Sequence, residues 1–326
     1  MGSHCVLALV ERGERVVVVD NLTTGFRNAV PDAALFVHGD AGDKDLIRSL
    51  IEREQVETII HLAASTVVPD STKQPLAYYQ NNTSHSRNLI EVATELSVPN
   101  FVFSSTAAVY GTGVEGLLTE TSELRPISPY GASKMMTERM LADASSAGGP
   151  GYAILRYFNV AGADPLCRTG QSTAGATHLI KVACQAALSR ERQITVFGTD
   201  YPTKDGTCVR DYIHVADLAK AHISVIDHLR KNGASDIFNC GYERGYSVLE
   251  VIRAVEYAAG KKFNVRLGER RPGDPHTVVA SSAKIRKTLS WSPGFDDLKS
   301  IVDHALAWEE RLAAYPRFGH GQEPEA

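Results

Sequence analysis

The sequence predicts an α/β protein built on a doubly wound, Rossmann-like parallel sheet, with a smaller α/β domain attached. Short β-branched or apolar runs alternate with longer helical patterns through the first half of the chain, which is typical of successive βαβ units. After about residue 160, Pro, Gly and Thr become frequent and this alternation ends. We therefore expect one domain from residues 1–160 plus about 212–241, and a second from about 161–211 plus 242–312.

The expected strands are continuous apolar runs, as in strands buried on both faces of a parallel sheet. They cover residues 15–20 (RVVVVD), 58–62 (TIIHL), 100–104 (NFVFS), 153–156 (AILR) and 237–241 (IFNCG). Helical patterns cover residues 43–54, 75–96, 128–147, 177–190 and 247–259. The polar stretch 313–326, which contains Gly and Pro, predicts a mobile tail.

Composition narrows the possible functions. Hydrophobic residues make up 43% of the chain, and the formal net charge is −4 without a strongly basic block. Nucleic acid is therefore not an expected partner, because phosphate backbones are bound by clustered Lys and Arg. The five cysteines include no C-x-x-C pair, which predicts neither a disulfide framework nor a metal site. Since no apolar run approaches the ~20 residues that span a bilayer, we expect a cytoplasmic protein.

Asp20, at the end of the first expected strand, indicates a dinucleotide site. An acid at this position accepts hydrogen bonds from the adenosine ribose and disfavours the extra phosphate of NADP. It normally lies about 20 residues after a glycine-rich turn, and Gly2 lies eighteen positions before Asp20. Gly2 thus corresponds to the last glycine of that turn, at the start of a helix that Gly13 ends.

The strand and the two glycines that normally precede this position are missing from the sequence. We expect a start placed too far downstream, rather than a protein that lacks its central strand. The second alternative would leave unpaired strand edges inside the sheet and remove the amides that hold a pyrophosphate.

Further candidates lie at successive strand ends, where ligands bind in such sheets. Asp40 follows the run FVHG and can contact the adenine through its carboxylate. The small pair Ala63 and Ala64 follows the next strand and allows a cofactor to approach the backbone.

Tyr130 and Lys134 lie four residues apart near the start of a predicted helix. That spacing is about one helical turn, so both side chains share one face. A nearby ammonium favours phenolate, which predicts a lowered Tyr130 pKa and a general base near neutral pH. Thr106, just past the strand NFVFS, supplies a hydroxyl that can bind the reacting alcohol.

These residues belong to longer segments that match a known family. The segments are GSH at 2–4, DNLTTG at 20–25, SSTAAVYG at 104–111, SPYGASK at 128–134, RYFNVAGA at 156–163, FGTDYPTKDGTCVRDYIHVADL at 197–218 and RRPGD at 270–274. On these segments the chain resembles the extended short-chain dehydrogenase/reductases and, among them, the UDP-glucose (UDP-galactose) 4-epimerases. The last three segments are specific to the sugar-nucleotide branch, whereas Y-x-x-x-K marks only the superfamily.

The resemblance implies tightly bound NAD, a UDP-sugar substrate and reversible oxidation at the sugar C4 through a 4-keto sugar. Tyr130 would take the proton of the 4-hydroxyl, Lys134 would tune Tyr130 and bind the nicotinamide ribose, and Thr106 would hold the 4-oxygen. The implied cofactor-binding residues are Gly2, Asp20, Asn21, Asp40, Ala41, Leu62, Ala63, Ala64, Asn81, Tyr130, Lys134, Tyr157 and Phe158. The implied substrate-binding residues are Thr106, Tyr130, Asn159, His178, Leu179, Thr195, Phe197, Arg210, Arg271 and Asp274, and no metal is implied.

Some residues in these segments have structural explanations as well. Arg210 alternatively forms an ion pair with Asp211. His214 and Asp217 are expected to serve packing and capping, and His61 is expected to be a hydrogen-bonded core histidine.

Two positions depart from the family pattern or affect specificity. Thr66 stands where many relatives carry a Lys near the cofactor, and the small Val278 leaves room for an N-acetyl group on the sugar.

Three other functions compete with UDP-glucose 4-epimerisation. A dehydratase needs an added acid and base, commonly directly after the Thr, but Ala107 and Ala108 follow Thr106 here. A 4-epimerase of UDP-N-acetylhexosamine or UDP-pentose has identical chemistry at C4 and stays open, as does a non-catalytic relic impaired in NAD binding. The family further implies a homodimer formed through helices 75–96 and 128–147.

Overall fold

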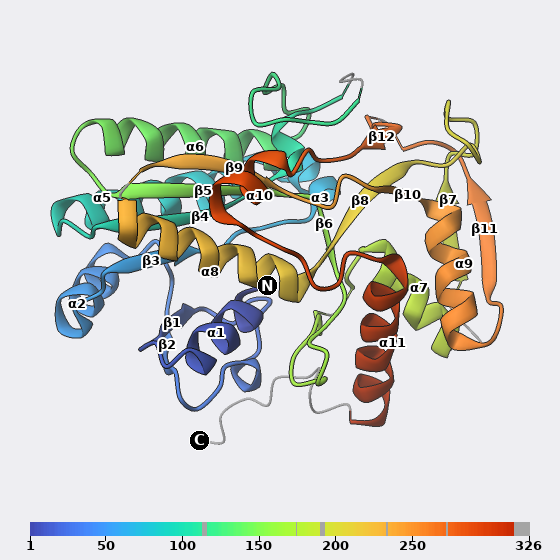
Figure 1. Cartoon of the computed structure of the whole chain (residues 1–326), viewed down its shortest axis with the longest axis horizontal. Coiled ribbons are helices and arrows are strands. Elements are labelled where there is room, and N and C mark those ends of the chain that lie inside the picture. The colour runs from blue at the N-terminus through green and yellow to red at the C-terminus, as the bar shows by residue number, and fades with distance from the viewer. Residues whose placement is uncertain (113–115, 174, 190–192, 233, 272, 316–326) are drawn as a thin grey trace.

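The computed structural model describes residues 1–112, 116–173, 175–189, 193–232, 234–271 and 273–315 (Figure 1). The described helices are α1 Gly2–Glu11, α2 Lys44–Glu54, α3 Val68–Lys73, α4 Pro75–Tyr78, α5 His85–Glu95, α6 Pro129–Ser146, α7 Leu179–Leu188, α8 Val215–Asn232, α9 Val248–Ala259, α10 Ala283–Leu289 and α11 Leu298–Ala314. The strands are β1 Val17–Asp20, β2 Leu35–His38, β3 Thr58–His61, β4 Asn100–Thr106, β5 Gly151–Tyr157, β6 Asn159–Ala161, β7 Gln193–Phe197, β8 Val209–His214, β9 Asp236–Cys240, β10 Gly245–Ser247, β11 Asn264–Gly268 and β12 Thr277–Val278.

The main sheet has the order β3-β4-β5-β9, and all of its strands are parallel. Helices cover both of its faces, which is the doubly wound arrangement expected from the sequence. Alternate residues of β4 serve the two layers: Phe101 and Phe103 pack with α2, α5 and α6, whereas Val102 packs on the side of α8. The late strand β9 pairs with β5, as its sequence predicted.

A second small parallel sheet, β1-β2, stands apart from β3 among the described residues. Val17–Asp20 pair with Leu35–His38 on one side only, and all four residues of β1 remain partly exposed. Strands β1 and β3 belong to separate sheets and are not hydrogen-bonded to each other. A continuous cavity of about 2700 Å³ reaches from this separation to the second half of the chain.

The second half of the chain builds two further sheets. In one, β8 lies between the antiparallel β10 and the parallel β12, with β6 also paired to β8. In the other, β11 and β7 pair in parallel. Helices α7, α9 and α11 share a core with these strands (Figure 1). Apolar periodicity did not reveal these short pairings, because their partners lie far apart in the sequence.

The helix expected over residues 75–96 is present from Pro75 to Glu95, but it is not α-helical throughout. It is divided into α4, a π-helical turn η2 over Tyr79–Ser84, and α5. Such turns are frequent at functional sites. The expected end of the 177–190 helix falls partly outside the described residues, since the structure describes that helix only to Leu188. The tail expected from residue 313 overlaps the end of α11, and its residues 316–326 also lie outside the described part.

Backbone amides of β1 and β2 are expected to exchange with solvent at least about tenfold faster than those of β4 and β5. A two-stranded sheet opens at a smaller free-energy cost than the interior of a larger sheet, and tenfold corresponds to about 1.4 kcal/mol. Hydrogen–deuterium exchange of the ligand-free protein measures this difference. Equal protection of all four strands would mean that both sheets open as one cooperative unit.

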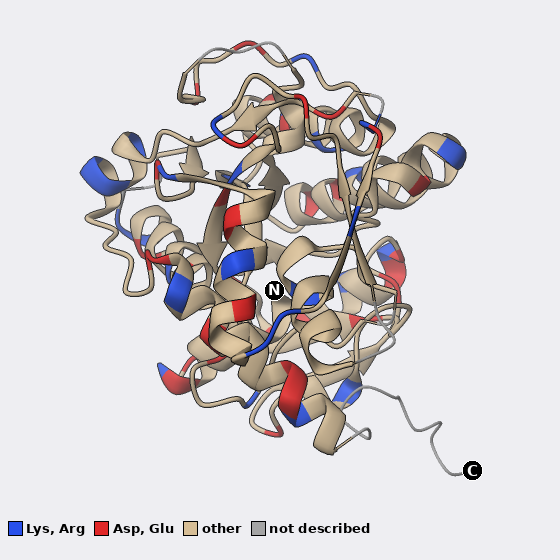
Figure 2. Ribbon diagram, turned by 90° about the vertical axis from the view of Figure 1, so that its right-hand side faces the viewer, with Lys and Arg blue, Asp and Glu red and all other residues tan. Residues whose placement is uncertain are grey.

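Basic and acidic residues both occur along the ribbon in many parts of the molecule (Figure 2). This distribution agrees with the small net charge of −4. Among the described helices, none is long and apolar enough to cross a membrane.

Candidate active site

Thr106 and Tyr130 meet at the end of β4 and the start of α6. Ser128 caps α6 by accepting a hydrogen bond from the Gly131 amide at 3.2 Å, and Pro129 occupies the first turn. A Cβ on Gly131 would lie only 2.4 Å from the carbonyl oxygen of Ala108. Glycine therefore lets α6 approach the backbone just past β4, which brings the Tyr130 hydroxyl close to the Thr106 side chain.

Lys134 lies one helical turn after Tyr130 and is buried, with 3% of its surface exposed. Its Nζ donates a hydrogen bond to the carbonyl oxygen of Ser104 at 3.0 Å and lies 4.9 Å from the centre of the Phe103 ring. Burial lowers the pKa of Lys134 to about 8, and the nearby Glu138 carboxylate acts in the opposite direction. The three predicted catalytic side chains are therefore close together at one strand end.

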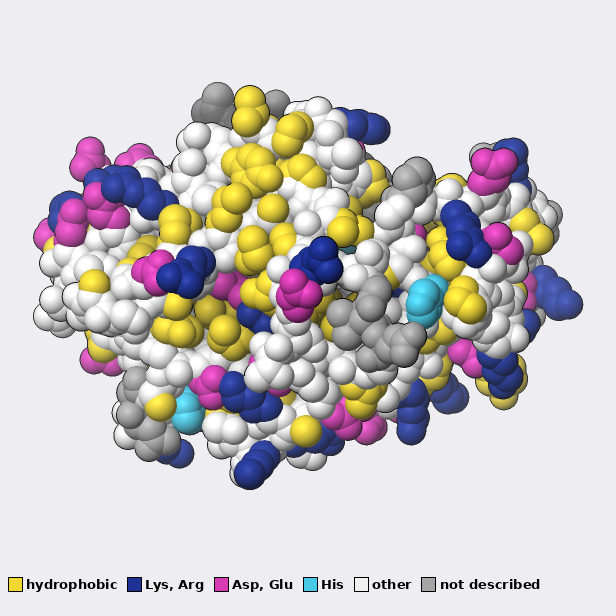
Figure 3. Space-filling view, turned by 90° about the horizontal axis from the view of Figure 1, so that it is seen from above, with side chains coloured by type: hydrophobic (Ala, Val, Ile, Leu, Met, Phe, Trp, Pro, Cys, Tyr) yellow, Lys and Arg dark blue, Asp and Glu magenta, His cyan; other side chains and the backbone are white. Residues whose placement is uncertain are grey.

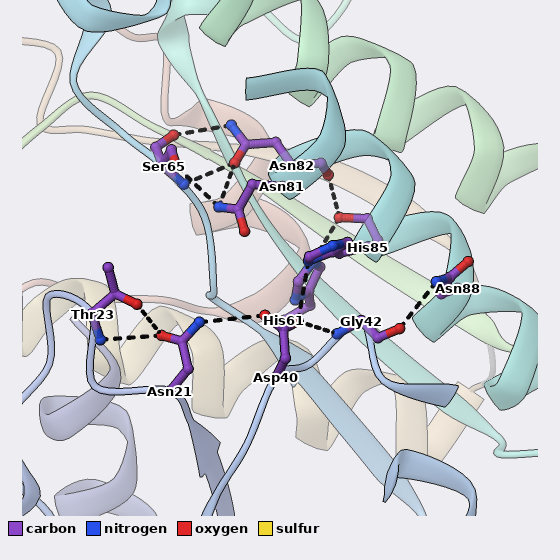
Figure 4. Close-up of polar contacts among 11 residues, drawn as sticks. Asn21, Thr23, Asp40, Gly42, His61, Ser65, Asn81, Asn82, His85 and Asn88 are labelled. Atoms are coloured by element: carbon purple, nitrogen blue, oxygen red, sulfur yellow. Dashed lines mark hydrogen bonds and ion pairs between the residues drawn. The ribbon is translucent and has the colours of Figure 1, made fainter. Parts of the chain in front are cut away.

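Polar side chains gather at the carboxyl ends of β1 and β2. The Asp20 carboxylate accepts a hydrogen bond from the Leu22 amide at 2.7 Å, and it lies 3.0 Å from where a Cβ on Gly25 would be. Asn21 donates to the Asp40 carboxylate at 3.4 Å (Figure 4). These contacts place two carboxylates and an amide at the edge where such sheets bind ligands.

The segment that follows β3 is held in place by the π-helical turn η2. Asn82 is buried and accepts from the Ser65 amide at 2.8 Å, while its own amide donates to the Ser65 carbonyl at 2.9 Å and the Ser133 hydroxyl at 3.0 Å. The neighbouring Asn81 donates to the Ser65 hydroxyl at 2.9 Å (Figure 4). The turn therefore fixes the segment after β3 against α6.

A third group lies on β7, β8 and the segment before β12. Arg210 and Asp274 form an ion pair with an Nη2–Oδ1 distance of 2.7 Å. The Arg271 guanidinium carbon lies 3.9 Å from the centre of the Phe197 ring, close enough for a cation–π contact. Such a cluster can bind both a phosphate group and an aromatic ring.

One cavity contains nearly all the predicted site residues. The cavity of about 2700 Å³ is lined by every predicted catalytic, cofactor-binding and substrate-binding residue except Lys134, which lies buried behind Tyr130. His178, at the N-cap of α7, and Leu179 line the same cavity, as do Thr195 and Asn159.

The chain also matches a family model and known proteins. The model described as the NAD dependent epimerase/dehydratase family matches residues 1–241. This chain belongs to that family. It is 50% identical over 312 residues to a UDP-glucose 4-epimerase of Azospirillum brasilense, covering 96% of this chain and 90% of the relative.

Two solved structures of epimerases resemble this family member over nearly its whole length. The crystal structure of a UDP-glucose 4-epimerase is 42% identical, with a TM-score of 0.93, covering 99% of this chain and 96% of that one. The UDP-Glc/GlcNAc 4-epimerase of Campylobacter jejuni is 44% identical, with a TM-score of 0.83, covering 95% of this chain and 96% of that one.

The residues of this epimerase/dehydratase-family chain fit a dinucleotide at both ends of the cleft. Carboxylates and an amide lie at the ends of β1 and β2, and a phenol and a hydroxyl lie at the end of β4. Between them α1 begins at Gly2 without a side-chain cap, and a helix N-terminus favours phosphate.

The lowered pKa that the sequence predicts for Tyr130 is wrong for this family member. Burial raises the pKa of Tyr130 to about 12, and its hydrogen bond with Thr106 only partly opposes this. Lys134 is engaged by the Ser104 carbonyl. The one-turn spacing predicted a shared helix face correctly, but the sequence did not reveal how deeply the phenol is buried.

The structure also decides between the alternatives for several residues. Arg210 pairs with Asp274, so the structural alternative for Arg210, an ion pair with Asp211, is wrong. The Asp211 carboxylate instead accepts backbone hydrogen bonds, including one from Tyr242 at 3.0 Å.

The packing roles expected for three other residues are confirmed. His61 is a buried histidine whose Nε2 lies 2.7 Å from the Ser86 hydroxyl. His214 accepts from the Ala216 amide, and Asp217 accepts from the Gly294 amide.

Sequence reasoning missed a buried network beneath Thr106. Glu138 accepts from Arg156 at 2.6 and 3.0 Å and also from the Ser105 hydroxyl. Both charged side chains are almost fully buried, at 5% and 3% exposure. The available signal was Glu138 one turn after Lys134 together with an arginine inside an apolar strand.

Without cofactor, the Tyr130 phenol is expected to stay protonated up to at least pH 10. The difference in phenolate absorbance between the wild type and Tyr130→Phe measures its titration, whose midpoint should lie near pH 12. NAD should lower this midpoint, because the nicotinamide ring is positively charged. Phenolate absorbance from Tyr130 at neutral pH in the free protein would contradict the burial argument.

Proposed function

We propose that the protein interconverts UDP-glucose and UDP-galactose by NAD-dependent epimerisation at C4. The observation that carries this proposal is the placement of the Tyr130 phenol beside the Thr106 hydroxyl, in the same cavity as the Arg210–Asp274 pair. The first pair suits proton transfer from a sugar hydroxyl, and the second group suits a nucleoside diphosphate.

The side chains have separate tasks in this proposal. Tyr130 takes the proton of the 4-hydroxyl and returns it, while Thr106 hydrogen-bonds the same oxygen. Lys134, held by the Ser104 carbonyl, provides positive charge behind the phenol. NAD, held by the residues of the cofactor side, would supply the hydride acceptor and donor for reversible oxidation at C4.

At the other end of the cavity, Arg210 and Arg271 bind the diphosphate, Asp274 binds the uridine ribose, and Phe197 lies against uracil. Binding then opens the Arg210–Asp274 ion pair and replaces it with contacts to substrate. This subsite is completed by Asn159, His178, Leu179 and Thr195.

The cofactor side of the cavity has three parts. The adenosine half is bound by Asp20, Asn21, Asp40 and Ala41, and Gly2 lies at the diphosphate. The path to the nicotinamide is lined by Leu62, Ala63, Ala64, Asn81, Tyr157 and Phe158.

Incubating the protein with NAD and UDP-glucose deuterated at C4 tests the proposal. We expect UDP-galactose to form and to retain deuterium at C4, because the hydride returns to the carbon that it left. Nuclear magnetic resonance resolves both sugars and the label. Loss of deuterium to solvent would contradict hydride return. Protein that neither binds NAD nor forms UDP-galactose would favour the non-catalytic alternative.

A second candidate activity is 4-epimerisation of UDP-N-acetylglucosamine. Val278 on β12 lines the cavity next to its strand partner Arg210, and its small side chain leaves space there. The Campylobacter relative is described as acting on both sugars. A UDP-pentose uses the same C4 chemistry and is accommodated by the same space.

Val278→Tyr is expected to lower kcat/KM for UDP-N-acetylglucosamine at least about tenfold, while UDP-glucose turnover changes less than about threefold. A larger side chain fills the space that the acetamido group needs, and tenfold corresponds to about 1.4 kcal/mol of transition-state stabilisation. Competitive turnover of the two sugars is the measurement. Val278→Ala is the control, because it enlarges the space instead of filling it and should leave the N-acetyl sugar accepted. Strict rejection of the N-acetyl sugar by the wild type would refute the idea.

We further propose two domains with the boundaries expected from the sequence, a cytoplasmic location and a homodimer through α4, α5 and α6. In support of the dimer, Leu76 on α4 and Met136 on α6 are exposed, at 79% and 42%. Hydrophobic side chains also gather on the face shown in Figure 3. Light scattering of the wild type and of Met136→Glu tests the dimer, because a buried charge at the interface should yield monomers.

A further inference from the structure

One contact at the cofactor edge has no counterpart in the motifs of the sequence. His85, the first residue of α5, places its Nδ1 at 3.1 Å from Oδ1 of Asp40 (Figure 4). An ionised carboxylate only accepts hydrogen bonds, so this contact favours a hydrogen on Nδ1. His85 comes directly after the π-helical turn, whose register aims this side chain.

The loop after β2 is packed against the same helix. A Cβ on Gly42 would lie 2.4 Å from Cγ of the His85 ring, so only glycine permits this approach. One turn later, Asn88 donates to the Gly42 carbonyl at 3.0 Å. Helix α5 therefore holds the loop backbone through Asn88 and the Asp40 carboxylate through His85.

The other partners of Asp40 leave one oxygen accessible. Oδ1 also accepts from the Gly42 amide at 2.7 Å, whereas Oδ2 has only the 3.4 Å contact with Asn21. The Asp40 side chain is 40% exposed and lines the large cavity, as His85 does. The Gly42 hydrogen bond and the His85 contact, both at Oδ1, restrict rotation of the carboxylate and leave Oδ2 less engaged.

We infer that His85 is a positioning residue that orients Asp40 to accept a hydrogen bond from the exocyclic amine of adenine. This inference rests on the proposed adenosine-binding role of Asp40. It makes His85 responsible for discrimination between adenine and a base that carries a carbonyl at the same position. A fixed carboxylate attracts the amine and repels the carbonyl, whereas a rotating one discriminates less.

The test compares dissociation constants for NAD and nicotinamide hypoxanthine dinucleotide, which replaces the amine with a carbonyl. A hydrogen bond to a charged group contributes about 1.5–3 kcal/mol, so the wild type should prefer NAD by roughly ten- to a hundredfold. His85→Ala should reduce this preference to within about threefold. His85→Asn, whose amide can replace the Nδ1 donor, should restore it.

Two variants separate this role from its alternatives. Asn88→Ala loosens the same loop without touching the carboxylate, and its preference for NAD should stay at the wild-type value. Asp40→Asn should lose the preference altogether. The KM for UDP-glucose at saturating NAD should be unchanged in His85→Ala, since the sugar site lies elsewhere.

Wild-type selectivity in His85→Ala combined with lost selectivity in Asp40→Asn would overturn the inference and leave the role of Asp40 intact. Wild-type selectivity in both variants would instead refute the adenosine-binding role itself. Equal losses in Asn88→Ala and His85→Ala would show that loop placement, rather than the carboxylate contact, determines selectivity.

Discussion

Tyr130→Phe is expected to lower kcat for UDP-sugar epimerisation about a thousandfold. The substitution removes only the hydroxyl that lies beside Thr106, and a positioned general acid–base contributes roughly 10²–10⁴-fold. Because the ring still fills its buried position, the melting temperature should change by no more than a few degrees. Initial rates with UDP-glucose and saturating NAD, together with thermal unfolding, measure both effects.

Tyr152→Phe is the matched control for this change. Tyr152 lies near the start of β5 and pairs with Phe101, at the end of the sheet opposite to Thr106 and Tyr157. Its hydroxyl is remote from the cavity, so activity should remain within about twofold of the wild type. A Tyr130→Phe rate within tenfold of the wild type would mean that another group transfers the proton.

Glu138→Ala is expected to lower the free energy of unfolding by about 3–5 kcal/mol. It leaves the Arg156 guanidinium buried without its carboxylate partner, and removal of one partner of a buried pair typically costs that much. It also removes the acceptor of the Ser105 hydroxyl, next to Thr106. Urea unfolding measures the loss.

The exposed pair on the same helix provides the control. Arg139 and Asp143 form an ion pair at 2.8 Å with exposures of 79% and 61%, and such pairs contribute at most about 1 kcal/mol. Arg139→Ala should therefore change stability by less than that. Replacing Glu138 with Met and Arg156 with Leu together should recover most of the loss, because no buried charge is then left unpaired. Equal effects of Glu138→Ala and Arg139→Ala would contradict the burial argument.

Local features of the sequence were sufficient for the larger elements. The strands of the main sheet follow from apolar runs, and Ser128 and Ser247 begin α6 and α9 through side-chain caps, the latter with Glu250 in a capping box. The helical spacing of Tyr130 and Lys134 likewise required no tertiary information. These predictions depend on interactions within one or two turns of the chain.

The second half was harder to predict for a physical reason. Strands β6, β10 and β12 have three residues or fewer and pair with β8, which lies far from each of them in the sequence, so neither length nor period identifies them. The interruption of the 75–96 helix by η2 also has no clear periodic signal. It matters for the site, because it determines where Asn82 and His85 point.

By itself, the sequence determined the fold class, the family and the residues that line the cavity, because motifs and strand ends place them together in any sheet of this kind. Only the tertiary structure decided their electrostatic state and partners. Burial raises the pKa of Tyr130, and Arg210 forms an ion pair with Asp274 instead of the adjacent Asp211. His85 contacts Asp40, although the two residues are 45 positions apart in the sequence. Each depends on desolvation or on contacts between separate elements, and no local pattern in a sequence encodes either quantity.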